Sequence, residues 1–300
     1  MPAVRQKFHL SPCAKFRNHF SLTQLSSGYS TTTYAYDANG NVTQKTTDGT
    51  TTTYVWDYAN RLTALGVGGA TTTYGYDWAE NRVSQTGTST TWIYPVKWYS
   101  VASSTGSGVQ FATTTDYVFN GDSLVATVDQ ETASGNATGT PATHYIHPDH
   151  LGSTNVVTNA SGTVEQTLDY FPYGGTRIST GQNAANRQYI GQFADQSNLD
   201  YLQARYYDPS RGQFLSEDPV FWENPKAQDL TNPQSLNSYS YANDNPITGK
   251  DPSGRLTSQS PVNITRNLLA DLIAFANNLA AFVNGLTHNP VQGVQSASHR

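Results

Sequence analysis

The amino-acid sequence predicts a mainly β protein made of stacked antiparallel β-hairpins, and three observations support this. A Thr/Tyr-rich motif recurs every 20 residues, beginning at Thr31, Thr51 and Thr71. Turn residues follow each motif, and a second strand-like run of alternating apolar residues follows each turn. With 19 Tyr, 24 Gly and 14 Pro in 300 residues, the composition is typical of a β-rich, turn-rich chain.

Each repeat contains three threonines, a tyrosine, a variable residue, a second aromatic residue and an aspartate. Alternate residues of a strand point to opposite faces, so the second threonine and both aromatics share one face, whereas the aspartate lies on the other. Val42, Leu62 or Val83 then opens the second strand. We expect the structural residues of the repeats to be Tyr34, Asp37, Tyr54, Asp57, Tyr74 and Asp77.

A hairpin of this length cannot bury its own apolar face, so neighbouring hairpins must stack and share a core. A weaker fourth unit, around Trp92 and Tyr94, extends the array. The Tyr-Asp signature of residues 29–99 resembles the YD repeats of the Rhs family. The resemblance implies a curved or spiralling sheet of hairpins, part of a hollow shell.

The repeat fades after about residue 99, and we assign residues 29–143 to this hairpin region. Thr115–Phe119 and Ser123–Val128 are predicted to pair across the turn at Asn120-Gly121. Residues 130–142 lack a strand pattern and are predicted to form an exposed loop.

Residues 144–254 carry five ordered motifs rich in aromatic and turn residues. Within the longest, Asp208-Pro-Ser-Arg-Gly212 predicts a turn that lets Tyr206-Tyr207 pair with Phe214-Leu215. The succession resembles the Rhs repeat-associated core domain, which implies that it ends the shell and precedes a variable C-terminal region that is often a toxin. The motif residues singled out are Arg205, Tyr206, Tyr207, Asp208, Gly212, Phe214 and Gly254.

Asp218 and Asp251 are the candidate catalytic residues of a self-cleavage reaction. In the shell-forming components of bacterial toxin complexes, which this block resembles, two Asp-Pro-x-Gly motifs supply carboxylates that cut the chain just after the second motif. Such chemistry needs two carboxylates close enough to share one proton. Here the first motif lacks its glycine, and Arg255 follows Gly254 where leucine is typical. Turn capping by each Asp-Pro is the structural alternative.

No cofactor or metal site is predicted. His144, His147 and His150 have a spacing that suggests ligands, but Pro148 breaks any helix that would align them, and residues three apart in a strand face opposite ways. We therefore interpret 149–153 as a turn. Cys13 is the only cysteine, so neither an intrachain disulfide nor a Cys-rich metal site can form.

The two ends differ from the rest. Residues 1–28 form an unassigned basic tail without the apolar run of a signal peptide, and no transmembrane segment is predicted. Residues 255–300 form a variable tail in which three-and-four apolar spacing predicts an amphipathic helix at about 261–285. We expect the chain to be the C-terminal portion of a longer protein, secreted or at the cell surface as the resemblance implies.

The leading functional hypothesis is a non-enzymatic scaffold, the closing part of a shell that encapsulates or presents a C-terminal toxin or other cargo. One alternative is an aspartic autoprotease that releases its own C-terminal segment. Another is a carbohydrate-binding adhesin that uses tryptophans. Expected partners are the C-terminal cargo, cell-surface glycans or an immunity protein, and the net charge of −5 argues against nucleic acid. The tryptophans considered for stacking on sugars are Trp56, Trp78, Trp92 and Trp98.

Overall fold

The computed structural model describes residues 22–25, 31–104, 111–181, 185–195, 197–227 and 230–255. All of them belong to one compact unit. The helix predicted at about 261–285 and most of the basic tail lie outside the described residues. Within the described part, no helix is long and apolar enough to cross a bilayer.

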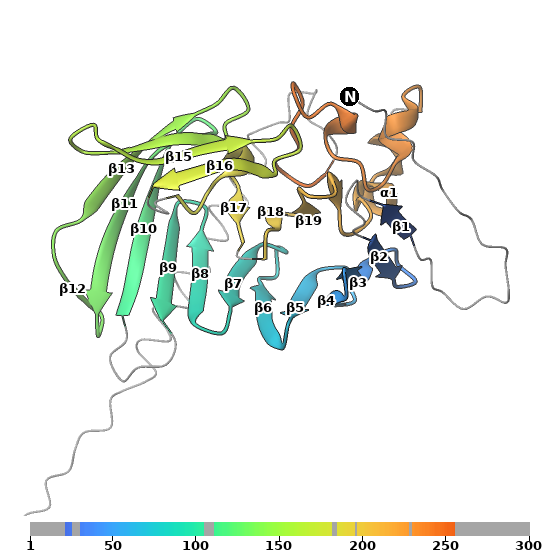
Figure 1. Ribbon diagram of the computed structural model, residues 1–300, viewed down its shortest axis with the longest axis horizontal. Coiled ribbons are helices and arrows are strands. Elements are labelled where there is room, and N and C mark those ends of the chain that lie inside the picture. Colours follow the sequence, from blue (N-terminus) through green and yellow to red (C-terminus); the bar gives the residue numbers. More distant parts are fainter. Residues whose placement is uncertain are drawn as a thin grey trace, which may run out of the picture. The chain divides into compact units, whose positions relative to one another are not determined.

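A 16-stranded antiparallel sheet dominates this unit (Figure 1). Along its main path each strand pairs with the next, and the outer strands β1 and β16 stand at opposite ends, so the described sheet is not closed. The path runs through β1 (Leu22–Leu25), β2 (Thr31–Tyr36), β3 (Val42–Thr47), β4 (Thr50–Trp56), β5 (Leu62–Val67), β6 (Ala70–Tyr76), β7 (Arg82–Thr86), β8 (Thr90–Val96), β9 (Tyr99–Ser104), β10 (Phe111–Asn120), β11 (Ser123–Ala133), β13 (Ala142–Pro148), β14 (Thr154–Asn159), β15 (Val164–Tyr170) and β16 (Thr176–Gly181).

The repeat hairpins form as predicted, with three refinements. Strand β1 lies in the tail left unassigned and pairs with β2. The predicted exposed loop at 130–142 is partly strand, because β11 continues to Ala133 and pairs with the short β12 (Asn136–Ala137). Finally, Arg82, not Val83, opens the second strand of the third repeat hairpin, because Arg82 pairs with Tyr76 as Val42 pairs with Tyr36.

The same turn chemistry closes each repeat hairpin. The Asp37 carboxylate accepts hydrogen bonds from the backbone N–H groups of Asn39 and Asn41, at 2.9 and 2.8 Å. Asp57 makes the equivalent pair of bonds at the next turn. Aspartate favours this position because its side chain can replace a backbone acceptor. The repeated aspartate therefore fixes the register of each hairpin.

A small four-stranded sheet packs on one face of the large one. Its strands are β17 (Phe193–Ala194), β18 (Asp200–Leu202), β19 (Arg205–Asp208) and β20 (Gln213–Phe214). Tyr34, Tyr54 and Tyr74 from the repeats share a core cluster with Tyr201 and Tyr206 of the small sheet. Over these hairpins the tyrosine face is thus packed as a core and does not line a hollow.

A second core lies on the other side of β19. Tyr207 and Phe214 pair across β19 and β20 and cluster there with Tyr241, while Tyr206 faces the repeats. The predicted pairing of Tyr206-Tyr207 with Phe214-Leu215 is confirmed. The remaining segments are short helices, namely α1 (Val220–Glu223) and the 3₁₀ turns η1 (Tyr189–Gly191), η2 (Pro225–Ala227), η3 (Pro233–Leu236) and η4 (Ala242–Asp244).

Candidate functional site

The two candidate carboxylates meet at one arginine. Arg205 Nη2 lies 2.9 Å from Asp218 Oδ2 and 3.3 Å from Asp251 Oδ2. The exposed fractions of the three side chains are 1%, 7% and 2%. The structure therefore brings together two residues that are 33 positions apart in sequence, and adds a cation between them. We call Arg205, Asp218 and Asp251 the carboxylate–arginine cluster.

Each aspartate also stabilises its own turn, so the structural alternative is present as well. Asp218 Oδ1 accepts a hydrogen bond from the N–H of Val220, 2.9 Å away, at the start of α1. Asp251 Oδ1 accepts from the N–H of Arg255 at 3.1 Å and from the hydroxyl of Ser253 at 3.2 Å. One oxygen of each carboxylate serves the local turn and the other serves Arg205.

The peptide bond between Gly254 and Arg255 lies directly against the cluster. The Arg205 Nε–H donates to the Gly254 carbonyl oxygen, and Asp251 accepts from the Arg255 N–H. A Cβ at Gly254 would stand 2.4 Å from the Leu202 carbonyl oxygen, and φ there is +62°, so only glycine fits. This close approach of backbone to cluster explains the final glycine of the second Asp-Pro-Ser-Gly motif.

Burial dominates the electrostatics of the cluster. Burial, together with the nearby Asp218, raises the pKa of Asp251 to about 6, although Arg205 opposes the change. Burial likewise lowers the pKa of Arg205, against the attraction of both aspartates. Two carboxylates share one guanidinium, so a proton on one of the carboxylates makes the net charge of the buried cluster zero.

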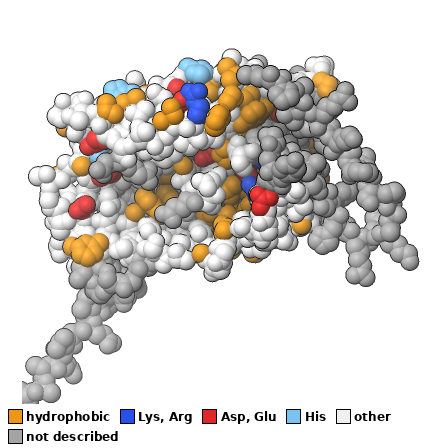
Figure 2. All heavy atoms as spheres, in the orientation of Figure 1, with side chains coloured by type: hydrophobic (Ala, Val, Ile, Leu, Met, Phe, Trp, Pro, Cys, Tyr) orange, Lys and Arg blue, Asp and Glu red, His pale blue; other side chains and the backbone are white. Residues whose placement is uncertain are grey.

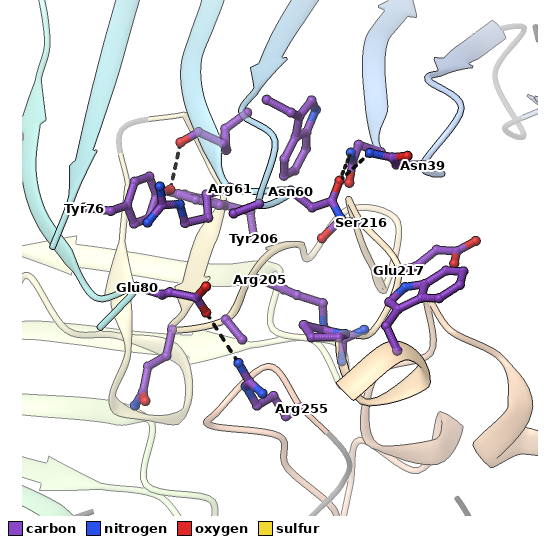
Figure 3. Close-up of a pocket in the computed structure, with 18 of the residues that line it drawn as sticks. Asn39, Asn60, Arg61, Tyr76, Glu80, Arg205, Tyr206, Ser216, Glu217 and Arg255 are labelled. Atoms are coloured by element: carbon purple, nitrogen blue, oxygen red, sulfur yellow. Dashed lines mark hydrogen bonds and ion pairs between the residues drawn. The ribbon is translucent and has the colours of Figure 1, made fainter. Parts of the chain in front are cut away.

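A cavity of about 190 Å³ borders the cluster (Figure 3). Arg205 and Arg255 form part of its wall, together with Glu80, Glu217 and Trp222. A space of this size has room for several water molecules. Water in this space can contact Arg205 and Arg255, which are the two residues of the site that line it.

The other core-domain motif residues have structural contacts. Asp208 binds Lys45 at 2.7 Å and thereby ties the turn after β19 to the first repeat hairpin. Gly212 adopts φ +69°, and a Cβ there would lie 2.9 Å from the Tyr173 ring. Tyr206, Tyr207 and Phe214 are buried in the two cores. These motif residues therefore have structural roles around Arg205.

Sequence reasoning missed a second buried charge pair. Arg82 Nη1 lies 2.6 Å from Asp195 Oδ2, and the two side chains are 1% and 2% exposed. Arg82 also lies over the ring of Tyr201, with its Cζ 4.4 Å from the ring centroid. The 20-residue period could have indicated the unusual arginine, because Arg82 occupies the position that the apolar Val42 and Leu62 have in the other two repeats.

The three histidines have separate partners. His144 Nδ1 lies 2.6 Å from Glu165, His147 Nε2 lies 3.1 Å from Thr158 Oγ1, and His150 Nε2 contacts the carbonyl of Ile247 at 2.7 Å. Residues 149–153 form the predicted turn between β13 and β14. Among the described residues, no group of three or more His, Cys, Asp or Glu side chains could hold a metal ion.

The four tryptophans predicted as candidates for stacking on sugars fall into two groups. Trp56 donates to the carbonyl of Val42 at 2.7 Å and packs against the repeat core, and Trp92 stacks on Tyr94. Trp78 and Trp98 are exposed. Two of the four indoles are therefore committed to packing.

Two families match the sequence, RHS Repeat over residues 36–67 and Teneurin YD-shell over residues 139–247. The tRNA nuclease WapA of Bacillus subtilis strain 168 is 28% identical over 159 residues, 47% of this chain and 6% of the relative. Toxin subunit YenC1 of Yersinia entomophaga is 30% identical over 115 residues, 37% of this chain and 11% of the relative.

Solved structures show the same fold. The Photorhabdus luminescens Tc holotoxin pore matches with a TM-score of 0.56 and 18% identity, over 77% of this chain and 13% of that one. The crystal structure of TcdB2-TccC3-TEV matches with a TM-score of 0.57 and 19% identity, over 75% and 13%. The chain thus spans only a small part of the length of these relatives.

Proposed function

Because the chain belongs to the Rhs/YD-repeat family, whose toxin-associated shell fold it shares, we propose that it is a structural scaffold that closes a β-shell around a C-terminal toxin or other cargo. Its work would be steric. A sheet that surrounds a cargo separates that cargo from the cell and from proteases.

The observation that carries this proposal is the packing of the small sheet on the tyrosine face of the repeats. Tyr206 lies between Tyr74 and Tyr201, with ring centroids 5.1 and 5.2 Å away. Figure 2 shows hydrophobic side chains gathered in the middle of the view and mostly uncharged polar surface around them. A sheet face capped in this way by a following segment is what an end closure requires.

Protection of a C-terminal cargo tests the proposal. An unstructured, protease-sensitive peptide is fused after Arg300, and the same peptide is fused before Met1 as the control. We expect the C-terminal peptide to be cut about tenfold more slowly, because enclosed chain must open before a protease can reach it. Equal rates of cutting at the two ends would rule out encapsulation by this chain.

A second candidate function, self-cleavage beside Gly254, is supported by the geometry of the cluster. Water would add to the Gly254 carbonyl carbon while one aspartate takes a proton from that water molecule. Arg205, which donates to the carbonyl oxygen, would stabilise the negative charge that develops there. The other aspartate would give its proton to the Arg255 nitrogen as the C–N bond breaks, which leaves a carboxylate and an amine.

Intact-mass measurement of the purified full chain tests this second candidate. A fragment that ends between Gly254 and Leu256, absent from the Asp218→Asn and Asp251→Asn variants, is the expected result. An unchanged 32.7 kDa species in every preparation would rule out self-cleavage and leave both aspartates with structural roles alone.

A further inference from the structure

The side chain of Arg255 contacts two glutamates from distant parts of the chain. Its Nη2 lies 3.4 Å from Glu223 Oε1 and 3.8 Å from Glu80 Oε2, and its Nη1 pairs with the other oxygen of Glu223. Glu223 ends α1, whereas Glu80 lies in the turn between β6 and β7. Figure 3 shows Glu80 and Arg255 pointing toward each other at one end of the cavity.

Both the backbone and the side chain of Arg255 are therefore held in place. The backbone N–H of Arg255 donates to Asp251, and its guanidinium is held by the two glutamates. Glu80 has φ +68°, at the position where the other two repeat turns have Gly40 and Asn60. A glutamate rarely adopts this conformation, so the turn accepts some strain to present a carboxylate at this point.

We propose that Glu80 and Glu223 form an acidic clamp that selects a basic residue immediately after Gly254. The inference rests on the proposed self-cleavage, for which the clamp would be a specificity determinant. By fixing both ends of residue 255, it keeps the Gly254–Arg255 bond aligned with Asp251 and Arg205, and alignment of the reacting bond sets the rate of an intramolecular step. The preferred sequence at the cut is therefore glycine followed by arginine or lysine.

Self-cleavage time courses of the full chain test the specificity. Arg255→Lys should stay within about twofold of the wild-type rate, whereas Arg255→Leu and the double variant Glu80→Gln/Glu223→Gln should be about fivefold slower, as for loss of a partly exposed ion pair. Glu217→Gln is the matched control, because it removes a charge from the same cavity wall without an ion pair to Arg255 among the described residues. Sodium chloride at about 0.5 M should slow the wild type towards the Arg255→Leu variant and leave that variant unchanged.

Trypsin provides a readout that needs no self-cleavage. It cuts after arginine and must take the guanidinium into its own pocket, so a clamped Arg255 should resist. In the Asp218→Asn chain, adding Glu80→Gln/Glu223→Gln should speed tryptic cutting at Arg255 about fivefold. Cutting at Arg177, whose side chain is 55% exposed, should not change.

The two assays separate the possible failures. A wild-type chain that never cleaves itself would overturn the self-cleavage proposal and the specificity role with it, while trypsin resistance would still support the clamp. Equal cleavage rates for the wild type and its Arg255→Lys and Arg255→Leu variants would overturn the specificity role even if self-cleavage occurs. Unchanged tryptic cutting at Arg255 in the double glutamine variant would overturn the clamp itself.

Discussion

At the scale of single residues, Asp251 links the candidate site to pH. Burial raises its pKa from 3.8 to about 6. The native state therefore binds this proton more tightly than the unfolded chain, and the stability that Asp251 contributes is greatest below about pH 4 and is lost as the pH rises towards 6. The same proton is the one that the leaving nitrogen would need.

Self-cleavage should accordingly be fastest below about pH 6 and fall about tenfold per unit at higher pH, because the reaction needs one protonated carboxyl group. Time courses between about pH 4.5 and 8, followed by intact mass, measure this. Asp251→Asn is the control and should be inactive throughout. A rate that is flat or rises through about pH 6 would show that Asp251 is not the acid.

Gly212 provides a residue-scale test of the core-domain motif. A side chain there would need φ +69° and would lie within 3 Å of the Tyr173 ring, whereas Gly121 has φ +61° with open space around it. Gly212→Val should therefore reduce the free energy of unfolding by about 1–3 kcal/mol more than Gly121→Val, the extra cost of overpacking. Urea unfolding compares the two variants, and equal losses would contradict the tight turn.

At the scale of elements, the third repeat hairpin depends on a buried ion pair. Arg82 occupies a position that is apolar in the other two repeats and reaches Asp195 beside the small sheet. A buried charge left without its partner is costly, but replacing both partners with apolar groups need not be. This ion pair therefore helps to set the position of the small sheet on the repeat hairpins.

Arg82→Leu should lower the free energy of unfolding by about 3–5 kcal/mol, because Asp195 would remain buried and uncompensated. The double variant Arg82→Leu/Asp195→Leu should recover most of this loss. Chemical denaturation of the two variants and the wild type makes the comparison. A double variant as unstable as the single one would show that the pair contributes more than charge compensation.

Local chemistry made the repeat hairpins predictable, since strand alternation and the Asp turns depend on neighbours in sequence. Arg82 with Asp195, and the clamp of Arg255, join residues far apart in sequence, and no local pattern specifies such contacts. Asp218 and Asp251 were identified through resemblance, but their shared arginine was not. Strand β1 was missed because four residues outside the period give too little pattern.

At the scale of the whole described unit, the small sheet and the repeats should behave as one body. Tyr34, Tyr54 and Tyr74 share one buried cluster with Tyr201, Tyr206 and Leu215. Lys45 bound to Asp208 and Arg82 bound to Asp195 add polar ties across the same contact. If residues 144–254 close the hairpin sheet, the small sheet cannot unfold while the repeat hairpins stay folded, and the reverse is also true.

Hydrogen exchange followed by mass spectrometry tests this closure most directly. Peptides from β4–β6 and from β18–β19 should be the slowest to exchange, with opening free energies within about 1 kcal/mol of each other, because they open in one cooperative step. Peptides from β4–β6 that exchange several kcal/mol more easily, while β18–β19 stays protected, would contradict the account.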